Sequence, residues 1–520
     1  MKKIFGILSS LSVKIGIVVA ILLIVPYLNL RVDLSSQKAY SLSRASKELM
    51  RSLEDVMVVK IIVSEDLPAE LNSLNRYLQD LLNEYQLNSR GKFRYEYVRN
   101  LSWEKLYGMA HENGVRVMRI QIYERDQMIS KEVIFGAIFE YQGKVQSLSL
   151  LPRIEPKLEY EITQCVQSLA KHKLPKVAVF RDTTYYDFDT QSFERNLAAN
   201  FTVVDADLSK PISEVDALLF TGTARSLPIG YLYNLDQYLM KGGRVVFLQD
   251  RVDTDGYNLY PMETNVIEIL EHYGFELSRD LVLDLSSDKR QTGLGVMANY
   301  PMYPVLRGGK HPITNNIDNI VMYLASGISF KGTEGTNFEP ILQSSIYSGW
   351  MEHPKFEVDQ DLFYDPQPQD FTAGPITTAA VIKGRISSFF TDSELAANDP
   401  GFVGKSPEQQ LILFGDKELV IDADREIYNN RNYIILNALD YLSGRDDLIH
   451  IRSRHLSSSN LSVPRFMNKM GIVWGDVPKI EKNIKHAAKA IAIVLPALIL
   501  ILIGLIRYLR RKAHIKMRYE

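Results

Sequence analysis

The stretch LDQYLMKGGRVVFLQD, Leu235–Asp250, decides the fold class of this chain. Leucines recur at helical spacing over Leu232–Leu239, Gly242-Gly243 ends the helix, and Arg244–Leu248 runs into an apolar segment typical of a buried strand. A helix joined by a tight glycine turn to a fully apolar strand is the repeating unit of α/β proteins. The stretch therefore predicts a parallel sheet covered by helices.

The same alternation extends on both sides of this stretch. The segments that read as strands or helices are Leu158–Lys171, Lys176–Phe180, Ser192–Ala199, Phe201–Val204, Ala217–Thr221, Thr264–Tyr273, Leu281–Leu283, Thr378–Ile382, Leu411–Phe414 and Asn432–Leu442. Alternating elements of this kind predict a doubly wound parallel-sheet domain over residues 152–450. Residues 293–374, rich in Gly, Pro and Asn, are expected to be irregular, as a functional loop or as an excursion between two halves of one sheet.

A smaller α/β domain is predicted over residues 31–151. Ser43 is placed to cap a short helix, and Val56–Val63 reads as a strand. Apolar residues at helical spacing follow over Leu71–Tyr85, and further strands are expected at Phe93–Val98, Val115–Tyr123 and Glu132–Tyr141. The domain contains no CxxC motif, so a thioredoxin-like shape would lack redox chemistry.

Two uncharged apolar runs near the ends predict membrane anchors. Residues 490–506 are long enough to span a bilayer, and the basic tail 507–520 that follows favours a cytoplasmic C-terminus. Residues 15–30 have no small-x-small cleavage site after them and read as an uncleaved first span behind the tail 1–14. Both termini are then cytoplasmic, the domains between them are extracytoplasmic, and residues 451–489 form a stalk.

Composition excludes several classes of function. The chain has 60 Lys+Arg against 62 Asp+Glu, a net charge of −2, and its large middle region has no basic block, so nothing indicates nucleic-acid binding. Its one cysteine, Cys165, excludes an intramolecular disulfide and a cysteine metal cage. Cys165 lies in an apolar helical stripe, which favours a buried structural side chain over a reactive thiol.

Two motif fragments fail on inspection. Gly404-Lys405-Ser406 resembles the end of a P-loop, but the glycine required five residues earlier is Asp399. Residues 253–256 resemble part of a calcium loop, but its first and last ligand positions are Arg251 and Met262. The histidines show no recognised metal spacing, so no metal and no cofactor are predicted.

The remaining candidates for a site follow the predicted strands. Asp182, Asp250 and Asp416 each come just after a strand, and carboxyl ends of parallel strands meet at one edge, where doubly wound sheets bind ligands. With Thr183 they form a possible ligand or partner cleft. Polar residues at strand ends also serve turns and helix caps, and the strand before Asp250 leads into no nucleophile elbow. No catalytic residue is predicted.

Several stretches taken together resemble the GldG family, auxiliary membrane proteins of ABC transport systems named for bacterial gliding motility. They are VDLSSQKAYSLS (Val32–Ser43), LEYEITQCVQSL (Leu158–Leu169), LDQYLMKGGRVVFLQD (Leu235–Asp250), LILFGDKELV (Leu411–Val420), NYIILNALDYLSG (Asn432–Gly444) and IVLPALILILIGLIRYLRRK (Ile493–Lys512). The resemblance implies a domain similar to one of intraflagellar-transport proteins, itself related to the glutamine-amidotransferase-like α/β fold. No cysteine follows Phe247, so that fold would be non-catalytic here.

The resemblance also implies partners, namely an ABC-2-type permease and a separately encoded cytoplasmic ATPase in the bacterial inner membrane. The expected function is that of a non-enzymatic auxiliary subunit which presents an extracytoplasmic substrate- or partner-binding domain. An envelope scaffold without a small-molecule ligand, or a surface hydrolase using the strand-end carboxylates, are the alternatives. Family members often carry Gly-rich turns where this chain has residues 181–184, RDTT, which puts a ligand contact there in doubt.

Overall fold

The computed structural model describes residues 41–456, except for positions 66, 100, 125–126, 153, 155–156, 171–173, 183–189, 255–257, 292–296, 316, 318–319, 333–334, 357–365 and 422–428. The chain divides into two compact units, Met1–Ala170 and Lys171–Glu520. The boundary falls after the helix that the sequence analysis assigned to the second domain. That helix packs on the sheet of the first unit, because its apolar face belongs to the core there.

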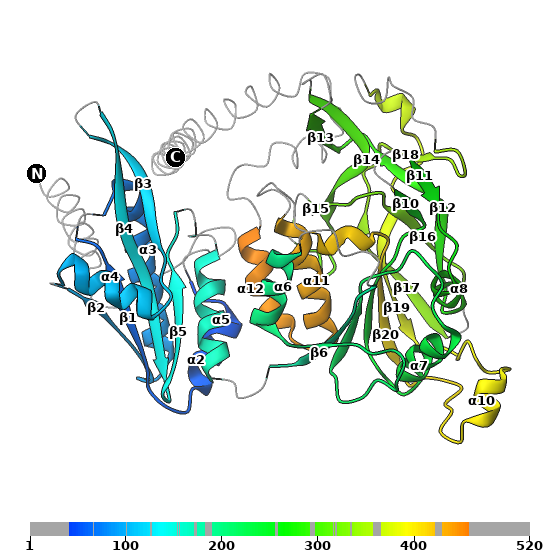
Figure 1. Cartoon of the computed structure of the whole chain (residues 1–520), viewed down its shortest axis with the longest axis horizontal. Helices are drawn as coiled ribbons and strands as arrows, with labels where there is room; N and C mark the ends of the chain where they lie inside the picture. The colour runs from blue at the N-terminus through cyan, green and yellow to red at the C-terminus, as the bar shows by residue number, and fades with distance from the viewer. Residues whose placement is uncertain are drawn as a thin grey trace, which may run out of the picture. The chain divides into compact units, whose positions relative to one another are not determined.

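The first unit combines one sheet with helices (Figure 1). Its elements are α2 (Arg44–Ser52), β1 (Met57–Val63), α3 (Ala69–Asn88), β2 (Phe93–Val98), α4 (Trp103–Glu112), β3 (Val117–Glu124), β4 (Gln127–Tyr141), β5 (Lys144–Ser149) and α5 (Leu158–Ala170). β1 pairs in parallel with β2 and antiparallel with β4, and the second half of β4 pairs with β5. The sheet runs β2-β1-β4, and both β3 and β5 pair with β4, β3 along its first half and β5 along its second.

A buried acid ties the two ends of this unit together. Ser43 caps α2 as predicted, its Oγ accepting a hydrogen bond from the Ser46 backbone N–H. Glu159 of α5 is buried and accepts hydrogen bonds from the Ser43 N–H at 2.7 Å and the Ser46 hydroxyl at 2.9 Å. Cys165 is buried on the same helix, and burial raises the pKa of its thiol to about 12. Such a thiol is unreactive at neutral pH, in line with the structural role expected for it.

The second unit holds the larger sheet. Its elements are β6 (Lys176–Phe180), α6 (Gln191–Asn200), β7 (Thr202–Asp205), β8 (Ala217–Phe220), α7 (Ile229–Met240), β9 (Val245–Leu248), β10 (Val252–Thr254), β11 (Leu259–Pro261), α8 (Asn265–His272), β12 (Phe275–Asp284), β13 (Ser287–Gln291), β14 (Met297–Gly308), β15 (Ile320–Val321), β16 (Ser326–Phe330), β17 (Thr336–Gln343), β18 (Ser348–Met351), η4 (Pro368–Asp370), β19 (Thr377–Gly384), α10 (Glu394–Asn398), β20 (Gln409–Phe414), η5 (Lys417–Val420), α11 (Asn429–Leu442) and α12 (Asp446–Leu456).

The main sheet is mixed, which corrects the expectation of a wholly parallel one. Its order is β13-β14-β17-β19-β20-β9-β8-β6-β7. The half from β20 to β7 is parallel, as the apolar runs predict, and the half from β13 to β20 is antiparallel. Residues 293–374, which were expected to be irregular, contain β14, β15 and β17 of this sheet, and also β16 and β18, which form a separate three-stranded sheet with β12. Prolines within β14 and β17 conceal their strand pattern, because proline interrupts a ladder and reads as a turn residue.

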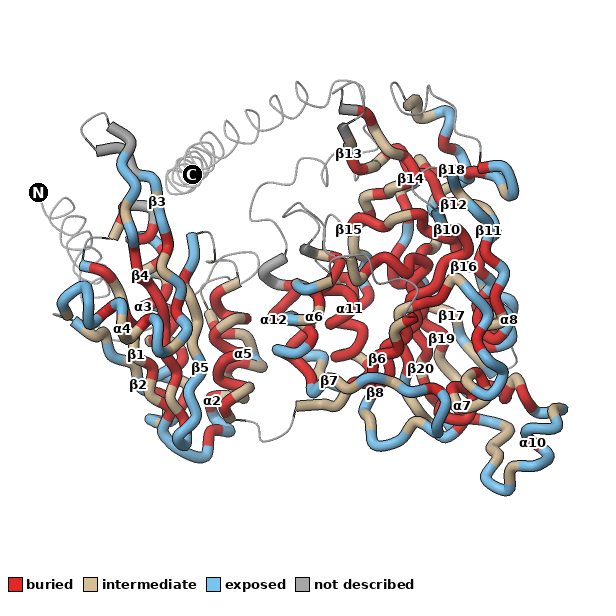
Figure 2. Tube along the Cα trace, viewed as in Figure 1, coloured by how far each residue is buried: buried red, intermediate tan, exposed pale blue. Residues whose placement is uncertain are grey.

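The two faces of this sheet carry different helices. Along β9, Val246 and Leu248 pack with α6 and α11, whereas Val245 and Phe247 pack with α7 and α8. Alternate residues of a strand point to opposite faces, so a continuous apolar run is needed to bury both. The central strands β8 and β9 are accordingly buried throughout and β6 is buried after its first residue, whereas β7 at the edge of the sheet is partly exposed (Figure 2). Helices on both faces are the doubly wound arrangement that the stretch around β9 predicts.

The end of the described chain differs from the expected stalk. α12 continues through residue 451, and Arg452 is buried, donating hydrogen bonds to Asn437 at 2.6 Å and Asp440 at 2.8 Å. The polar sequence from residue 451 onward predicts a solvated linker, but the hydrogen bonds of Arg452 to α11 hold the end of α12 in the second unit. The predicted spans 15–30 and 490–506, both tails and residues 457–489 lie outside the described residues. Within the described part of the chain, no helix is long and apolar enough to cross a membrane.

Candidate functional site

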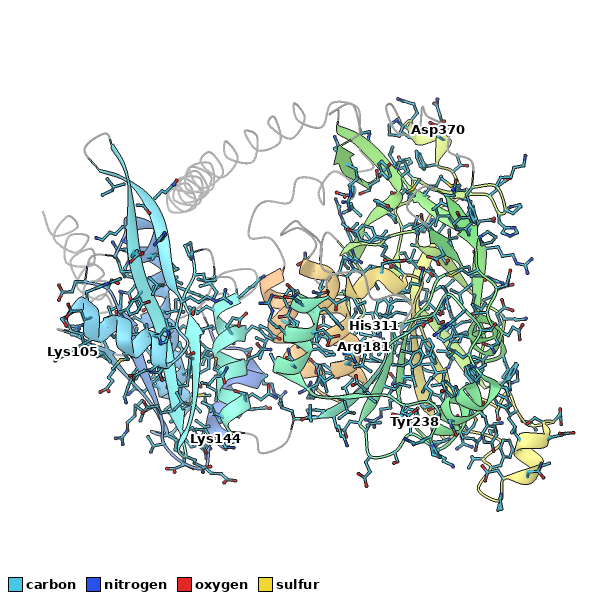
Figure 3. All side chains as sticks on the ribbon, in the orientation of Figure 1. Lys105, Lys144, Arg181, Tyr238, His311 and Asp370 are labelled. Atoms are coloured by element: carbon cyan, nitrogen blue, oxygen red, sulfur yellow. The ribbon has the colours of Figure 1, made fainter. Side chains whose placement is uncertain are left out.

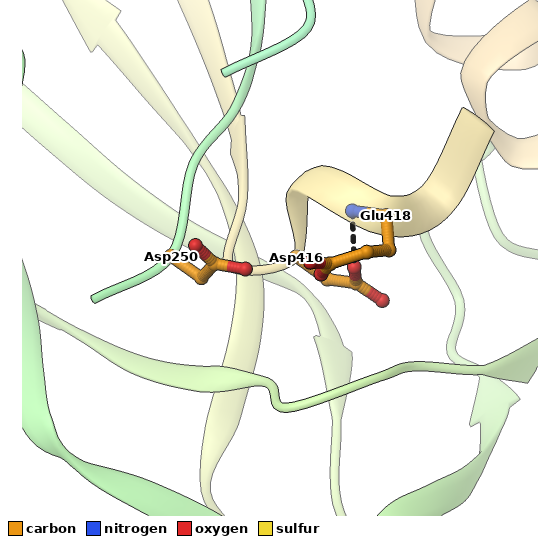
Figure 4. A group of neighbouring side chains, drawn as sticks. All are labelled: Asp250, Asp416 and Glu418. Carbon is orange, nitrogen blue, oxygen red and sulfur yellow. Dashed lines mark hydrogen bonds between the residues drawn. The ribbon is translucent and has the colours of Figure 1, made fainter. Parts of the chain in front are cut away.

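The three strand-end aspartates lie at the carboxyl edge of the parallel strands. Asp182 follows β6, Asp250 follows β9 and Asp416 follows β20, and all three side chains are buried. Asp250 and Asp416 come close together, as the sequence analysis anticipates, and Figure 4 shows their side chains with Glu418 beside them. Asp182 binds other partners. Thr183 lies outside the described residues.

A buried lysine occupies the centre of this edge. Lys417 Nζ lies 3.1 Å from Asp250 Oδ1 and 3.0 Å from Glu418 Oε1, and its side chain is 1% exposed. Asp253 Oδ1 lies 3.5 Å from the same nitrogen, and the Val252 carbonyl accepts a hydrogen bond from it at 3.4 Å. We refer to Asp250, Asp416, Lys417 and Glu418 as the Lys417 cluster. Sequence reasoning missed Lys417 and Glu418, because adjacent charged residues after a strand are typical of a solvated turn.

Asp416 holds the loop that carries this lysine. Its Oδ1 accepts a hydrogen bond from the Glu418 N–H at 2.7 Å and so caps η5, as the dashed line in Figure 4 marks. Its Oδ2 accepts another from the Tyr323 N–H at 2.7 Å. The buried guanidinium of Arg431 stacks on the Tyr323 ring at 4.1 Å and donates to the Glu418 carbonyl. One carboxyl group therefore joins η5 to residues almost a hundred positions away.

The electrostatics of the cluster follow from its burial. Burial raises the pKa of Asp416 to about 8, with Arg431 opposing the rise and the Glu418 carboxylate adding to it. Burial also raises the pKa of Asp250, opposed by the Lys417 ammonium. Removing a carboxylate from water disfavours its charged form, and only a nearby cation offsets that cost. Burial therefore favours the neutral form of Asp416, and Lys417 lies against Asp250 and Glu418.

The oxygen atoms of this cluster could in principle hold a cation. Asp250, Asp416 and Glu418 each offer a carboxylate oxygen, and these atoms lie within 4.8 Å of one another. The position between Asp250 and Glu418 is, however, already taken by the Lys417 ammonium, which is bonded to both. A divalent ion would have to displace a buried side chain and leave its charge without a partner. The residues present thus fit an internal ion pair and not a metal centre.

A glycine makes room for the lysine. Gly222 follows β8 with φ +85°, and a Cβ there would lie 2.5 Å from the Leu248 carbonyl oxygen and 2.7 Å from Lys417 Cβ. Only glycine adopts this backbone at low cost and allows so close an approach. Gly222 is therefore needed for Lys417 to reach the cluster. The sequence did not predict this role, because a single glycine after a strand is common in turns.

Asp182 lies at the point where the strand order reverses. The chain passes from β6 outward to β7 and then returns to β8 on the other side of β6. Asp182 Oδ2 accepts a hydrogen bond from the Thr223 hydroxyl at 2.6 Å, and its Oδ1 pairs with Arg225 at 3.0 Å. Arg181, labelled in Figure 3, pairs with Glu194 at 2.8 Å. Ligands of doubly wound sheets bind at such a point. Here, however, Asp182 bonds to Thr223 and Arg225, and Arg181 bonds to Glu194.

The space left at this edge is small. Arg181, Asp182, Gly222 and Lys417 are among the described residues that line a cavity of about 40 Å³. A water molecule takes up about 30 Å³ of liquid, whereas pockets for small-molecule ligands measure roughly 300–1,000 Å³. The described residues of the sheet edge therefore enclose space for about one water and none for a substrate.

Comparison with known proteins gives a family for the larger unit. The model of a family described as an ABC-type uncharacterized transport system matches residues 171–438, and a domain of unknown function matches residues 36–140. An uncharacterized protein of Borreliella burgdorferi is 18% identical over 502 residues, which cover 93% of each chain. A solved structure of the mmIFT52 N-terminal domain aligns with 51% of this chain and 97% of its own, at 13% identity and a TM-score of 0.31.

Proposed function

Because this chain belongs to the family described as an ABC-type uncharacterized transport system, we propose that it is a non-enzymatic auxiliary subunit of an ABC-2-type transporter. Membership of the family gives it a transporter-associated auxiliary role. The finer assignment adds a separate permease and ATPase as partners and a domain that binds a substrate or another protein. The finer assignment also includes membership of the GldG family. Gliding motility is one of several processes that such an auxiliary subunit could serve.

The closed carboxyl edge of the parallel sheet carries the non-enzymatic part of this proposal. Enzymes with doubly wound sheets place catalytic groups there, in clefts open to substrate. Here Lys417 and its carboxylates are bonded to one another, and the described residues leave about 40 Å³ beside them. These bonds stabilise the ends of β9 and β20, which is a structural task.

The raised pKa values of Asp416 and Asp250 are the observations that favour a hydrolase, and that of Asp416 is raised to about 8. Perturbed carboxyl groups are frequent in active sites, since a general acid or base needs a pKa near the working pH. Asp416, however, is fully buried and uses both oxygens to accept backbone N–H groups. An acid that holds a loop in this way has no free oxygen to offer a reacting group.

Substitution of Asp416 separates the two functions. Asn keeps one of the two acceptor oxygens of Asp416 and places an amide NH2 against the other backbone N–H. Asp416→Asn should therefore lose about 1–3 kcal/mol of stability but support normal transport per folded molecule. A hydrolase with Asp416 as its acid or base would lose roughly 100- to 10,000-fold in turnover. Transport measured per amount of folded protein decides between them. If the variant folds but no longer supports transport, the proposal of a non-enzymatic auxiliary subunit is refuted.

Association with a transporter is tested by purification. The tagged full chain, expressed with the permease and ATPase encoded beside it, should retain both through affinity purification in a mild detergent. An unrelated membrane protein with the same tag serves as the control. A chain that never retains either partner, under conditions that keep permease and ATPase together, contradicts the proposal.

The proposed location is extracytoplasmic, with both termini in the cytoplasm. It rests on the apolar runs 15–30 and 490–506 and on the basic tail 507–520. Protease added to intact spheroplasts should then cleave between residues 31 and 489 and spare a C-terminal tag. Protection of the whole chain until the membrane is opened would overturn this topology.

A further inference from the structure

A second and much larger cavity lies in the antiparallel part of the second unit. It measures about 570 Å³ and lies between β14 and β17, the residues after β12 and the loop 344–347. We refer to it as the β14–β17 cavity. This volume is within the range of pockets that hold small-molecule ligands, and it exceeds the space at the sheet edge more than tenfold.

The strand pairing explains why the space is open. Among the described residues, β14 and β17 pair at two positions, Arg307 with Gln343 and Gly308 with Leu342. On its other side β17 shifts register against β19 twice, between Pro340 and Leu342 and again before Gln343. Register shifts turn side chains away from their regular direction and bend the strand, and they are frequent beside binding sites. The two strands therefore separate at a fixed place and leave a gap between two parts of the core.

The floor of the cavity is apolar. Leu285, Leu306, Ile341 and Leu342 line it and are buried by at least nine-tenths. Ile346 also lines it but is 60% exposed, an unusual position for an isoleucine in a loop. A ligand that covered Ile346 would remove apolar surface from water, which is favourable. The lining thus suits the apolar part of a ligand.

Two cations lie on the same lining. Arg307 is half-buried at the end of β14, and Lys310 is exposed just beyond it. The described residues that line the cavity include no aspartate or glutamate, although Asp284, behind the loop 344–347, attracts the Arg307 guanidinium. A polar ligand group held here would therefore be an anion, and a guanidinium beside an ammonium suits a carboxylate or a phosphate.

The rim is held in place before any ligand arrives. Asp284 accepts hydrogen bonds from the Ser345 N–H at 2.6 Å and the Ser345 hydroxyl at 2.8 Å. The Leu285 N–H donates to the Tyr347 carbonyl at 3.0 Å, and the Ile376 N–H donates to the Ser344 hydroxyl at 2.7 Å. A loop fixed at both ends loses little entropy when a ligand binds, so less of the interaction energy is spent on ordering the rim.

We propose that the β14–β17 cavity binds an amphiphilic anion, with its apolar body on Leu306 and Ile346 and its carboxylate or phosphate between Arg307 and Lys310. The site is separate from the Lys417 cluster, and neither the family description nor the strand-end aspartates point to it. The inference does not depend on association with a transporter, because the full chain alone suffices to test it.

Octanoate is a suitable probe, with octanamide as its uncharged counterpart and octyl phosphate as a second anion. Addition of octanoate to the full chain should slow hydrogen exchange in residues 340–347, and octanamide should require about tenfold higher concentration for the same effect. Octyl phosphate tests whether a phosphate is held in preference to a carboxylate. Equal protection by octanoate and octanamide would overturn the role of the two cations.

Matched variants place the effect in this cavity. Ile346→Asp puts a negative charge at the exposed rim and should weaken octanoate binding at least tenfold, whereas Ile229→Asp, at a 54% exposed isoleucine elsewhere in the same unit, should not. Lys310→Gln should weaken it several-fold and Lys405→Gln should leave it unchanged, since both lysines are exposed. Full octanoate protection in Ile346→Asp, or no protection in the unmodified chain, refutes the proposal.

Discussion

Replacement of Lys417 by methionine tests the interpretation of the sheet edge directly. Methionine keeps the length and most of the apolar volume of the lysine side chain but removes its charge. Asp250 and Glu418 then lose the cation that lies 3.1 Å and 3.0 Å from their oxygens. Lys417 and Asp250 are 1% and 0% exposed, so solvent screens this loss very little.

The size of the effect follows from these distances. At an effective dielectric constant of about 20, an ammonium 3 Å from a carboxylate contributes roughly 5 kcal/mol, and breaking a buried pair on one side costs about 3–5 kcal/mol. A carboxyl group left without its cation can instead bind a proton, which at pH 7 costs about 4 kcal/mol for an ordinary aspartate. We therefore expect Lys417→Met to lower the free energy of unfolding by about 3–4 kcal/mol at pH 7.

The loss should depend on pH in one direction. Burial already raises the pKa of Asp250, and without Lys417 to oppose it the folded-state pKa rises further. A carboxyl group whose folded pKa exceeds its unfolded value binds an extra proton in the folded state, so stability falls as pH rises through that window. The deficit of the variant should be largest near pH 7 and shrink toward pH 5, by up to about 1.4 kcal/mol per unit for each group.

Native-state hydrogen exchange in β9 and β20 is the suitable measurement, because a chain of two units need not unfold in one step. Lys210→Met is the control. Its lysine pairs with Asp207 at 2.9 Å but is 77% exposed, so no change in exchange is expected. A deficit in Lys417→Met below about 1 kcal/mol, or one that stays constant between pH 5 and 7, would refute the reasoning.

Three further predictions concern other parts of the two units. Gly222→Ala should lower the free energy of unfolding, measured by denaturant titration, by about 1–3 kcal/mol, because Gly222 has a φ of +85° and a Cβ there would lie 2.5 Å from the Leu248 carbonyl oxygen. Gly230→Ala is the control and should be neutral or stabilising, because a Cβ there would have no atom within 4 Å. Burial raises the pKa of Asp284 to about 6, so the folded parent binds an extra proton between pH 4 and 6 and loses up to about 3 kcal/mol of stability as pH rises through that window. Asp284→Asn should abolish this loss, and parallel pH slopes for the two proteins would contradict the prediction. Arg452→Met should lower the free energy of unfolding by about 1.5–3 kcal/mol and the melting temperature with it, because buried Asp440 loses one charged hydrogen-bond partner and keeps Arg445 as the other. A melting temperature within a degree of the parent would show that α12 adds little stability.

The parallel half of the larger sheet was predictable because each strand is a short apolar run. Val245–Leu248 needs both faces covered, and that requirement alone indicates helices above and below. The antiparallel half was not predictable in the same way. β14 contains two prolines and pairs with different strands along its length, so its sequence shows neither alternation nor a continuous apolar run. α4 was missed as well, because only Leu106 and Ala110 of its residues are buried.

The candidate site was predictable only in part. The position of Asp250 and Asp416 after parallel strands places both at one edge, but nothing in the sequence makes β9 and β20 neighbours. Their adjacency depends on the long excursion between them, and it alone brings Lys417 to Asp250. Charged side chains are rarely buried completely, so a sequence-based assignment leaves Lys417 and Glu418 on the surface. The buried pairing results from tertiary structure and leaves no local pattern.

In the second unit, the residues that stabilise the parallel core differ from those proposed to bind a ligand, which lie in the segment between β9 and β20. The ion pairs at the sheet edge stabilise the parallel core, and the described residues there enclose a cavity of about 40 Å³. The β14–β17 cavity is lined by residues of the excursion, and among its described strands β19 is the one that pairs with β20 of the core. Substitutions at Arg307, Lys310 or Ile346 can therefore change what is bound without disturbing the packing of β6, β8 and β9. We expect the auxiliary proteins of different transporters to differ in ligand through this region, because charge and size there vary at little cost in folding free energy.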